Sequence, residues 1–404
     1  MRKKVLGLLG LLLAAVAAAG IYDWAFWYNY LRFIGGGPPD FLGALDRYPT
    51  TEPVPGDLTQ ALPGATGEER RFAEAIAYAR EMQSDSLLVW HDGALRVEWY
   101  REGLGPGIRP ETASMHKSIL GLAFGLAIEQ GHIGSVDDPV SLYLPEWRGE
   151  PRGGITIRNL LNMASGFMFY TPSRNPYADF NQLLFGMRLE RLMLELQLAS
   201  PPGARFAYAN VNSQLLGVIL ERATGRRYAD FVSENLWQPL GADDAYVWLD
   251  RPGGLARTYA AFLARPRDWL RLGLMIKDGG RYDGRRIVSG QWIDEMTAAS
   301  GREPNYGYQI WLSNEDVRKR YYTEEREGVG FAISEPFLSD DLVYFDGIGG
   351  QRVFISADDD YVIVRTGPRR VDWDEAVLPN AVARALVAAS IQLAPLLETG
   401  NDPE

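Results

Sequence analysis

The segments with strand-forming sequence lie at the two ends of the body of this chain, and a long helical stretch separates them. Residues 86–103, SLLVWHDGALRVEWYREG, are typical of a β-hairpin with a His91-Asp92-Gly93 turn. Residues 342–367, LVYFDGIGGQRVFISADDDYVIVRTG, predict two more strands around a second turn. Two distant strand pairs share a core most simply as one antiparallel sheet, so we predict an α+β fold with an inserted helical lobe.

The boundaries follow from the same pattern. Helices are expected at residues 66–82 and 373–397, and we expect them to cover the sheet. The sheet lobe then spans about 66–110 and 300–398, and the helical lobe about 111–299. Together they form one domain over residues 66–398. A site for chemistry is expected at the seam between the two lobes.

The amino terminus has the pattern of an export signal. Arg2-Lys3-Lys4 precedes an apolar stretch from Val5 to Tyr22, which is typical of a secretory signal peptide or a short membrane anchor over residues 1–34. A cleavage site at Ala17-Ala18-Ala19 remains open, whereas the aromatic residues that follow favour an uncleaved anchor. These aromatic residues are Trp24, Trp27, Tyr28 and Tyr30. We therefore predict an exported protein, periplasmic or membrane-anchored, with a Gly- and Pro-rich linker at 35–65.

Composition excludes several classes of function. The formal net charge is −11 and no basic stripe is present, which disfavours a nucleic-acid partner. The chain has no cysteine and three scattered histidines, so we expect no thiol nucleophile, no metal site and no cofactor. The expected partner is a small-molecule substrate, and the sequence leaves the oligomeric state open.

The stretch TASMHKSIL contains the first candidate for chemistry. Ser114 and Lys117 are three residues apart, which places them on one face of a helix. The free amides at the start of that helix would favour an oxyanion and disfavour an ammonium group. A buried lysine could then take the proton of the serine hydroxyl. The alternative is a helix-capping serine beside a solvated lysine.

Lysine is rare in this chain, which supports the first interpretation. Only five of the 41 basic residues are lysines, and two of these lie in the leader. Arginine cannot give up its proton in a protein, whereas a buried lysine can act as a base. No histidine follows Ser114 in the order that a Ser-Asp-His hydrolase requires, so lysine or tyrosine remains as the base.

Two further elements are candidates for the same site. Tyr208-Ala209-Asn210 opens a helix that we expect to be capped by Asn210 or Asn212, and its tyrosine could relay a proton. The alternative is ordinary packing. Glycines at 347, 349 and 350 begin a strand, where a substrate could approach the backbone closely. The amide of Ile348 could then face that of Ser114 in an oxyanion hole, unless the glycines only form a turn or bulge.

These motifs, in this order, resemble those of the serine hydrolases related to class C β-lactamases and penicillin-binding proteins. Further stretches are similar too, including GITIRNLLNMASG and PGARFAYANVNSQLLGVILERATG, and the resemblance covers about residues 66–395. It implies a β-lactamase/transpeptidase-like fold and an acyl-enzyme mechanism. It also implies Ser114 as nucleophile, Lys117 as base and Tyr208 as proton shuttle, with Asn210 in support. The Ser114 and Ile348 amides would form the oxyanion hole.

The third motif departs from the β-lactamase pattern. Where the family has Lys-Thr-Gly, this chain has Phe345-Asp346-Gly347, so the cation that would bind a β-lactam carboxylate is missing. The GIGGQ form resembles the branch of 6-aminohexanoate-dimer hydrolases and carboxylesterases. We therefore predict cleavage of an ester or linear amide. The alternatives are a D,D-peptidase or weak β-lactamase, and a silent binding protein. Expected substrate contacts are Tyr170, Asp346, Gly347 and Gly349.

Overall fold

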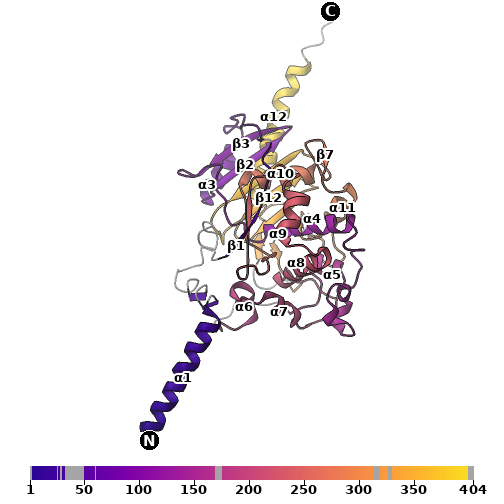
Figure 1. The fold of residues 1–404 in the computed structure, drawn as a ribbon. Coiled ribbons are helices and arrows are strands. Elements are labelled where there is room, and N and C mark those ends of the chain that lie inside the picture. The colour runs from indigo at the N-terminus through magenta and orange to yellow at the C-terminus, as the bar shows by residue number, and fades with distance from the viewer. Residues whose placement is uncertain are drawn as a thin grey trace, which may run out of the picture.

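The structure is a computed structural model, and it describes most of the chain. The described residues are 2–24, 26–27, 30–31, 50–59, 61–168, 175–313, 319–325 and 330–398. Figure 1 shows a compact body from which α1 (Arg2–Tyr22) extends at one end, while the end of α12 (Val377–Glu398) extends at the other.

The remaining elements are as follows. The other α-helices are α3 (Ala73–Glu81), α4 (His116–Glu129), α5 (Ile157–Leu161), α6 (Asp179–Phe185), α7 (Leu189–Leu194), α8 (Asn210–Thr224), α9 (Tyr228–Val232), α10 (Pro266–Lys277) and α11 (Gly290–Met296). The short helical turns are η2 (Ala113–Met115), η3 (Val140–Leu142), η4 (Pro145–Trp147), η5 (Pro151–Gly154) and η6 (Ser233–Trp237). The strands are β1 (Thr51–Val54), β2 (Ser86–His91), β3 (Ala94–Tyr100), β4 (Ala245–Trp248), β5 (Phe262–Leu263), β6 (Arg281–Tyr282), β7 (Arg285–Arg286), β8 (Trp311–Leu312), β9 (Lys319–Tyr321), β10 (Gly330–Ala332), β11 (Val343–Gly347), β12 (Gln351–Ser356) and β13 (Tyr361–Thr366).

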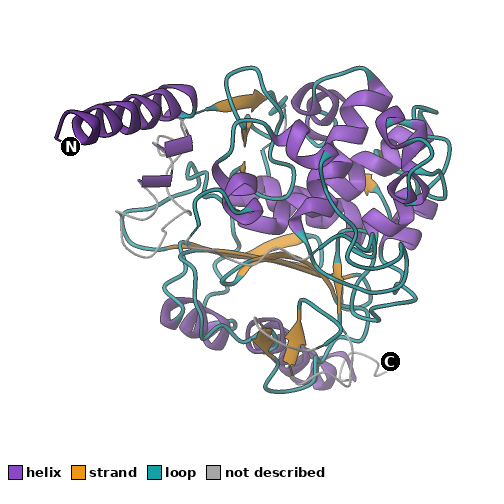
Figure 2. Ribbon diagram, turned by 90° about the horizontal axis from the view of Figure 1, so that it is seen from below, coloured by secondary structure: helices purple, strands orange, loops and turns teal. Residues whose placement is uncertain are grey.

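The main sheet confirms the fold predicted from the two ends of the chain. Its six strands are antiparallel in the order β3-β2-β13-β12-β11-β8, so β2 from the first hairpin pairs directly with β13 from the second. Figure 2 shows this sheet edge-on, with the large helical lobe on one face and a smaller layer on the other. The structure therefore has the α+β, β-lactamase/transpeptidase-like architecture that the sequence predicted.

Alternating side chains explain why both faces of the sheet are covered. Leu88 points to the core of the helical lobe, whereas its neighbours Leu87 and Val89 belong to a second core with α3 and α12. Successive strand residues point to opposite faces, so an apolar run such as SLLVW buries both. On the lobe side α10 packs against β12 and β13, and Gly273 gives it room, because a Cβ there would lie 2.5 Å from Val362.

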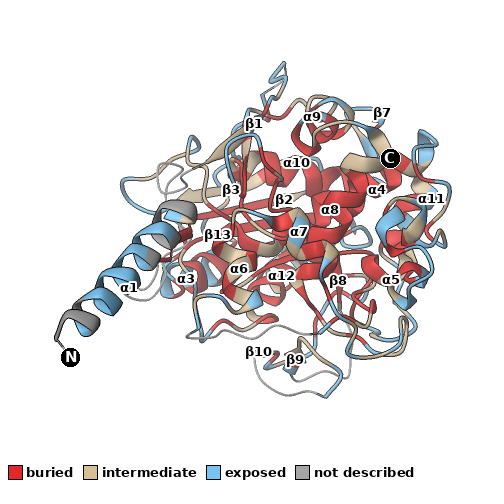
Figure 3. Cartoon of the chain, turned by 60° about the horizontal axis from the view of Figure 1, so that its bottom comes forward, coloured by how far each residue is buried: buried red, intermediate tan, exposed pale blue. Residues whose placement is uncertain are grey.

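The centre of the helical lobe is formed by α4 and α8, which are in contact and almost entirely buried. Figure 3 shows both helices in red beside the sheet, whereas much of α1 is exposed. A three-stranded sheet, β1-β4-β5, lies in the same lobe. An isolated bridge joins its strand β5 at Leu263 to Glu111, just before α4. This bridge connects the small sheet to the Ser114 turn.

Several predicted boundaries are wrong. The predicted linker at 35–65 contains β1, which pairs with β4 almost 200 residues later, so these residues belong to the body. The last segment contains three strands instead of two, because β11 precedes β12. The first helix begins at Ala73 instead of residue 66, and the last begins at Val377 instead of residue 373.

The segment after α1 is in contact with the body. Tyr30 is buried, and its ring packs against that of Phe185 at a centroid distance of 6.0 Å. Trp24 remains exposed, and Tyr28 lies outside the described residues. None of the helices in the described part of the chain has the length and apolarity that crossing a membrane requires. Export of the protein stays a prediction.

Candidate active site

Ser114 lies on a sharp turn between the small sheet and the α4 helix. Ala113, just before it, has a φ of +50°, a left-handed conformation that non-glycine residues rarely adopt. Ser114 is the middle residue of the 3₁₀ turn η2, and α4 follows at once from His116. Strained backbone of this kind is concentrated at functional sites, where the surrounding structure holds it. The turn presents the serine at the amino-terminal end of a buried helix.

Lys117 reaches back to Ser114, as the three-residue spacing predicted. Its Nζ lies 2.8 Å from Ser114 Oγ and 2.9 Å from Asn210 Oδ1. The main-chain oxygen of Tyr259 is 2.6 Å away. The residue is 1% exposed, and no described carboxylate forms an ion pair with it. The lysine therefore contacts only neutral oxygens.

This environment changes the protonation of Lys117. Burial lowers its pKa from 10.5 to about 7, although the charges of Asp346 and Glu111 act in the opposite direction. Near neutral pH, the amine is therefore neutral in a large fraction of molecules. A neutral amine with an available lone pair can accept the proton of Ser114.

We expect the rate of ester hydrolysis to rise with pH through an apparent pKa near 7. Protonated Lys117 cannot accept a proton, so kcat/KM should fall tenfold per pH unit well below that value. A pH–rate profile with a p-nitrophenyl ester, between pH 5 and 9, measures this. A profile that stays flat to pH 5 would contradict the role of Lys117 as base. Control measurements of folding by circular dichroism cover the same range.

Tyr208 lies on the other side of the amine. Its main-chain amide donates to the oxygen of Tyr322 at 2.8 Å, and the two rings are stacked with centroids 4.8 Å apart. Lys117 Nζ lies 5.0 Å from the centre of the Tyr208 ring. Burial raises the pKa of Tyr208, as does the charge of Asp346, so the phenol keeps its proton at neutral pH. The phenol is thus suited to donate a proton, and Lys117 is the better base.

Asn210 contacts Lys117, but the capping prediction was wrong. Asn210 is the first residue of α8, the capping position is Ala209, and no side chain caps this helix. The side chain of Asn210 instead accepts from Lys117, and Asn212 donates from Nδ2 to the oxygen of Ala209 at 3.2 Å. The polar group of Asn210 is therefore used to position the amine.

The glycine-rich end of β11 lies against the Ser114 turn. A Cβ on Gly347 would be 2.2 Å from the oxygen of Thr112, so only glycine allows this approach. Gly349 has a φ of +83°, and a Cβ there would be 2.4 Å from Arg369. Contacts within the protein thus already require both glycines, which were predicted as substrate contacts. The approach at Gly347 brings the end of β11 against the η2 turn that carries Ser114, and the place of the Ile348 amide in an oxyanion hole stays a prediction.

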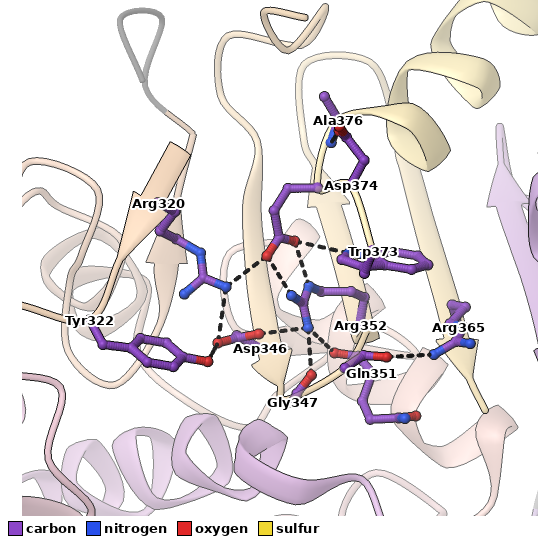
Figure 4. Close-up of polar contacts among 12 residues, drawn as sticks. Arg320, Tyr322, Asp346, Gly347, Gln351, Arg352, Arg365, Trp373, Asp374 and Ala376 are labelled. Carbon is purple, nitrogen blue, oxygen red and sulfur yellow. Dashed lines mark hydrogen bonds and ion pairs between the residues drawn. The ribbon is translucent and has the colours of Figure 1, made fainter. Parts of the chain in front are cut away.

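Asp346 points away from any open surface. It is 2% exposed, and its carboxylate lies 3.2 Å from Arg320 and 2.6 Å from Arg352. Figure 4 shows Asp346 between these two guanidinium groups, with the hydroxyl of Tyr322 also directed at it. Phe345, at the position of the family's lysine, is fully buried in the core. The triplet that replaces Lys-Thr-Gly therefore offers no exposed cation.

Of the other predicted site residues, Tyr170 lies outside the described residues. His116 faces away from Ser114, with Nδ1 2.7 Å from the oxygen of Ala260 and Nε2 2.8 Å from Tyr228 Oη. Burial lowers its pKa to about 4, so it is neutral. No group of acidic or histidine side chains suited to a metal ion occurs among the described residues.

Sequence reasoning missed three participants. The oxygen of Tyr259 is a main-chain atom, so no residue type could have indicated it. Tyr322 is remote from the motifs along the chain, whereas Glu111 lies three residues before Ser114 without belonging to a motif. Its closeness to the predicted nucleophile was the one available signal for Glu111.

Comparison with known proteins identifies the family and several relatives of this chain. A family model described as beta-lactamase matches residues 69–385. The 6-aminohexanoate-dimer hydrolase of Paenarthrobacter ureafaciens is 31% identical over 236 residues, which are 55% of this chain and 59% of that protein. Penicillin-binding protein 4* of Bacillus subtilis is 31% identical over 191 residues, 47% of this chain and 41% of that protein. The chain thus matches well under two thirds of the length of either relative.

Solved structures show the same fold. A Bacillus anthracis protein assigned as a 6-aminohexanoate-dimer hydrolase superposes with a TM-score of 0.68 at 20% identity, covering 87% of this chain and 93% of that one. The six-stranded sheet, the inserted helical lobe and the family match over most of the sequence lead to one conclusion: the chain belongs to the beta-lactamase family.

Proposed function

We propose that this protein is a serine hydrolase that cleaves an ester or a linear amide through an acyl-enzyme. The observation that carries the proposal is the contact between Ser114 and a buried, carboxylate-free Lys117, whose Nζ is 2.8 Å from the serine Oγ. A lysine with a pKa near 7 in contact with a serine hydroxyl is the arrangement of an activated nucleophile.

Each residue has a role in the proposed reaction. Ser114 Oγ attacks the carbonyl carbon while Lys117 takes its proton, and the amides of Ser114 and Ile348 stabilise the oxyanion. Tyr208 gives its proton to the leaving group and regains one from Lys117. Water then attacks the acyl carbon while Lys117 takes its proton, the bond to Ser114 Oγ breaks, and Lys117 returns the proton to the serine oxygen. Asn210 and the Tyr259 carbonyl hold the lysine amine in place.

The surroundings of Asp346 favour a substrate without a carboxylate next to the scissile bond. A β-lactam or a D-alanyl peptide carries such a carboxylate, and the family binds it with the lysine that is here replaced by buried Phe345. The two cations beside Asp346, Arg320 and Arg352, are buried and paired with it, so they are not free to bind a substrate carboxylate. This supports an ester or linear amide over the alternatives of D,D-peptidase and weak β-lactamase.

We expect a fluorophosphonate to label the wild-type protein once, at Ser114, and the Ser114→Ala variant to remain unlabelled and inactive on p-nitrophenyl esters. Intact-mass spectrometry and peptide mapping measure the adduct. The matched control is Ser118→Ala, on the same helix, where the buried hydroxyl donates to the oxygen of Gln309 at 2.9 Å. This control should be labelled like the wild type.

Two outcomes would contradict the proposal. A stable penicilloyl adduct on Ser114 would move the function to cell-wall peptides or β-lactams. The absence of any adduct in a folded wild-type protein would favour a silent binding protein.

A further inference from the structure

Glu111 lies three residues before Ser114 and joins two segments of the site with one oxygen atom. Its Oε1 accepts hydrogen bonds from the amide of Ala113 at 2.6 Å and from that of Ala261 at 2.8 Å. The residue is only 4% exposed. A charged side chain is seldom buried this deeply unless its hydrogen bonds are needed there.

Both amides belong to left-handed backbone. Ala113 has a φ of +50° and Ala261 a φ of +62°. Alanine has no polar side chain that could stabilise this conformation by a local hydrogen bond. Such conformations persist only where surrounding contacts hold them. The carboxylate of Glu111 supplies one contact to each. Since Ala113 directly precedes Ser114, this contact bears on where the serine hydroxyl points.

The second segment, residues 259–263, contacts the start of α4 and the residues just before it. The oxygen of Tyr259 accepts from Lys117 at 2.6 Å, and the oxygen of Ala260 lies 2.7 Å from His116 Nδ1. The hydroxyl of Thr112 donates to the oxygen of Phe262 at 3.1 Å. Glu111 therefore fixes the serine turn against the segment before β5, which supplies one of the three oxygens around the lysine amine.

Resting on the proposed function, we propose that Glu111 is a positioning residue for the Ser114–Lys117 pair. The two hydrogen bonds to its carboxylate oxygen fix the Ser114 turn relative to the Tyr259 carbonyl. This arrangement keeps the serine hydroxyl within hydrogen-bond distance of the lysine amine. It touches neither the substrate nor the reacting atoms, and it acts through the backbone of residues 113 and 261.

The charge of Glu111 adds a second effect. Burial raises the pKa of Glu111 to about 7, while its two amide bonds and the charge of Lys117 act in the opposite direction. When ionised, Glu111 raises the pKa of Lys117, as does Asp346 on β11.

Besides Arg257, whose charge acts on Tyr259, the titratable groups packed here include His116 and Tyr259, which carry no charge near neutral pH. His116 on α4 has a pKa lowered by burial to about 4, and burial raises the pKa of Tyr259. Loss of the Glu111 charge should therefore lower the pKa of Lys117 further.

The test compares two substitutions with a matched control in the full chain. Glu111→Gln keeps an oxygen that can accept both amides but removes the charge, whereas Glu111→Ala removes the acceptor. The control is Asp250→Ala, because Asp250 is also buried and accepts from two amides, Leu189 at 3.1 Å and Leu255 at 2.9 Å. The readouts are the fluorophosphonate labelling rate, kcat and KM on a p-nitrophenyl ester, and the pH–rate profile.

We expect Glu111→Ala to lose about 100-fold in kcat and in labelling rate with little change in KM, since misplaced reacting groups cost this much. We expect Glu111→Gln to stay within about tenfold of the wild-type kcat, with the acid limb of its profile moved to lower pH. Asp250→Ala should lose thermal stability and keep the wild-type kcat and profile.

The outcomes separate the two proposals. If the wild type is not labelled at Ser114, the proposed function fails and the inference on Glu111 fails with it. If the wild type is labelled and Glu111→Ala reacts at the same rate, only the inference on Glu111 is overturned. Should Glu111→Ala not fold, Glu111→Gln decides: it keeps the acceptor oxygen, so a loss of kcat well beyond tenfold would overturn the inference that this oxygen positions the pair.

Discussion

Lys117→Arg is expected to be as inactive as Lys117→Ala, with kcat/KM for a p-nitrophenyl ester lowered by about 10²–10⁴-fold in both. An arginine would keep the positive charge and the donors, but it cannot give up its proton. If Lys117 served only as a charge or a hydrogen-bond donor to Ser114, Asn210 and Tyr259, arginine would restore much of the activity. The comparison thus distinguishes a lysine that acts as the base from a lysine that acts only as a positive charge.

The control for this substitution is Lys277→Arg. Lys277 lies at the end of α10 and forms ion pairs with Asp278 at 2.7 Å and with Asp360, so it acts only as a cation. We expect this variant to keep wild-type activity. Turnover by Lys117→Arg within tenfold of the wild type would contradict the assignment of Lys117 as the base.

Glu375→Gln is expected to destabilise the protein by about 3–5 kcal/mol, because it removes one partner of a buried ionic cluster. Glu375 lies 2.7 Å from Arg320 and 2.5 Å from Arg352, and these two arginines also flank Asp346 (Figure 4). All four side chains are buried. With glutamine, two guanidinium groups would share a single remaining carboxylate in a place that water does not reach.

The same cluster predicts how stability depends on pH. Burial alone would raise the pKa of Glu375, but the charges of Arg352 and Arg320 outweigh it and hold the pKa at about 2, below the ordinary 4.5. The stabilisation is therefore complete above pH 4.5 and is lost as the pH falls towards 2. Urea unfolding at pH 7 and at pH 4 measures both effects.

The control is Asp372→Asn, which removes an exposed ion pair with Arg370 and should leave the free energy of unfolding almost unchanged. An equally small effect of Glu375→Gln would show that the buried cluster does not stabilise the fold.

The sequence predicted those parts of the fold whose signal is local. The β2–β3 hairpin follows from the apolar run SLLVW and the alternating segment ALRVEWY on either side of Asp92-Gly93. Both turn residues have the left-handed φ that such a turn requires. By contrast, β1 pairs with β4 from a Pro-rich segment, and nothing near residue 51 indicates that partner. The strand β11 was merged with β12 because the glycines between them were assigned to a strand start.

The candidate site, like the fold, was predictable only where the signal is local in the sequence. Ser114 and Lys117 meet because residues three apart on a helix share a face, which the sequence alone predicts. Tyr208 and Asn210 were candidates from their place at a helix start, and the family resemblance implied their roles; the structure brings both next to Lys117. The Tyr259 carbonyl and the pairing of Asp346 with Arg320 depend on tertiary contacts, so no local pattern could reveal them.

The most direct test of the central claim is an NMR titration of the lysine side chains in the full chain, labelled with [ε-¹³C]lysine. The chain has only five lysines, so the signal of Lys117 can be assigned as the one missing from Lys117→Arg. We predict that this resonance titrates near pH 7, well below the ordinary lysine value of about 10.4. If the Lys117 resonance titrated near the ordinary value instead, the amine would be protonated at neutral pH, and it could not be the base for Ser114.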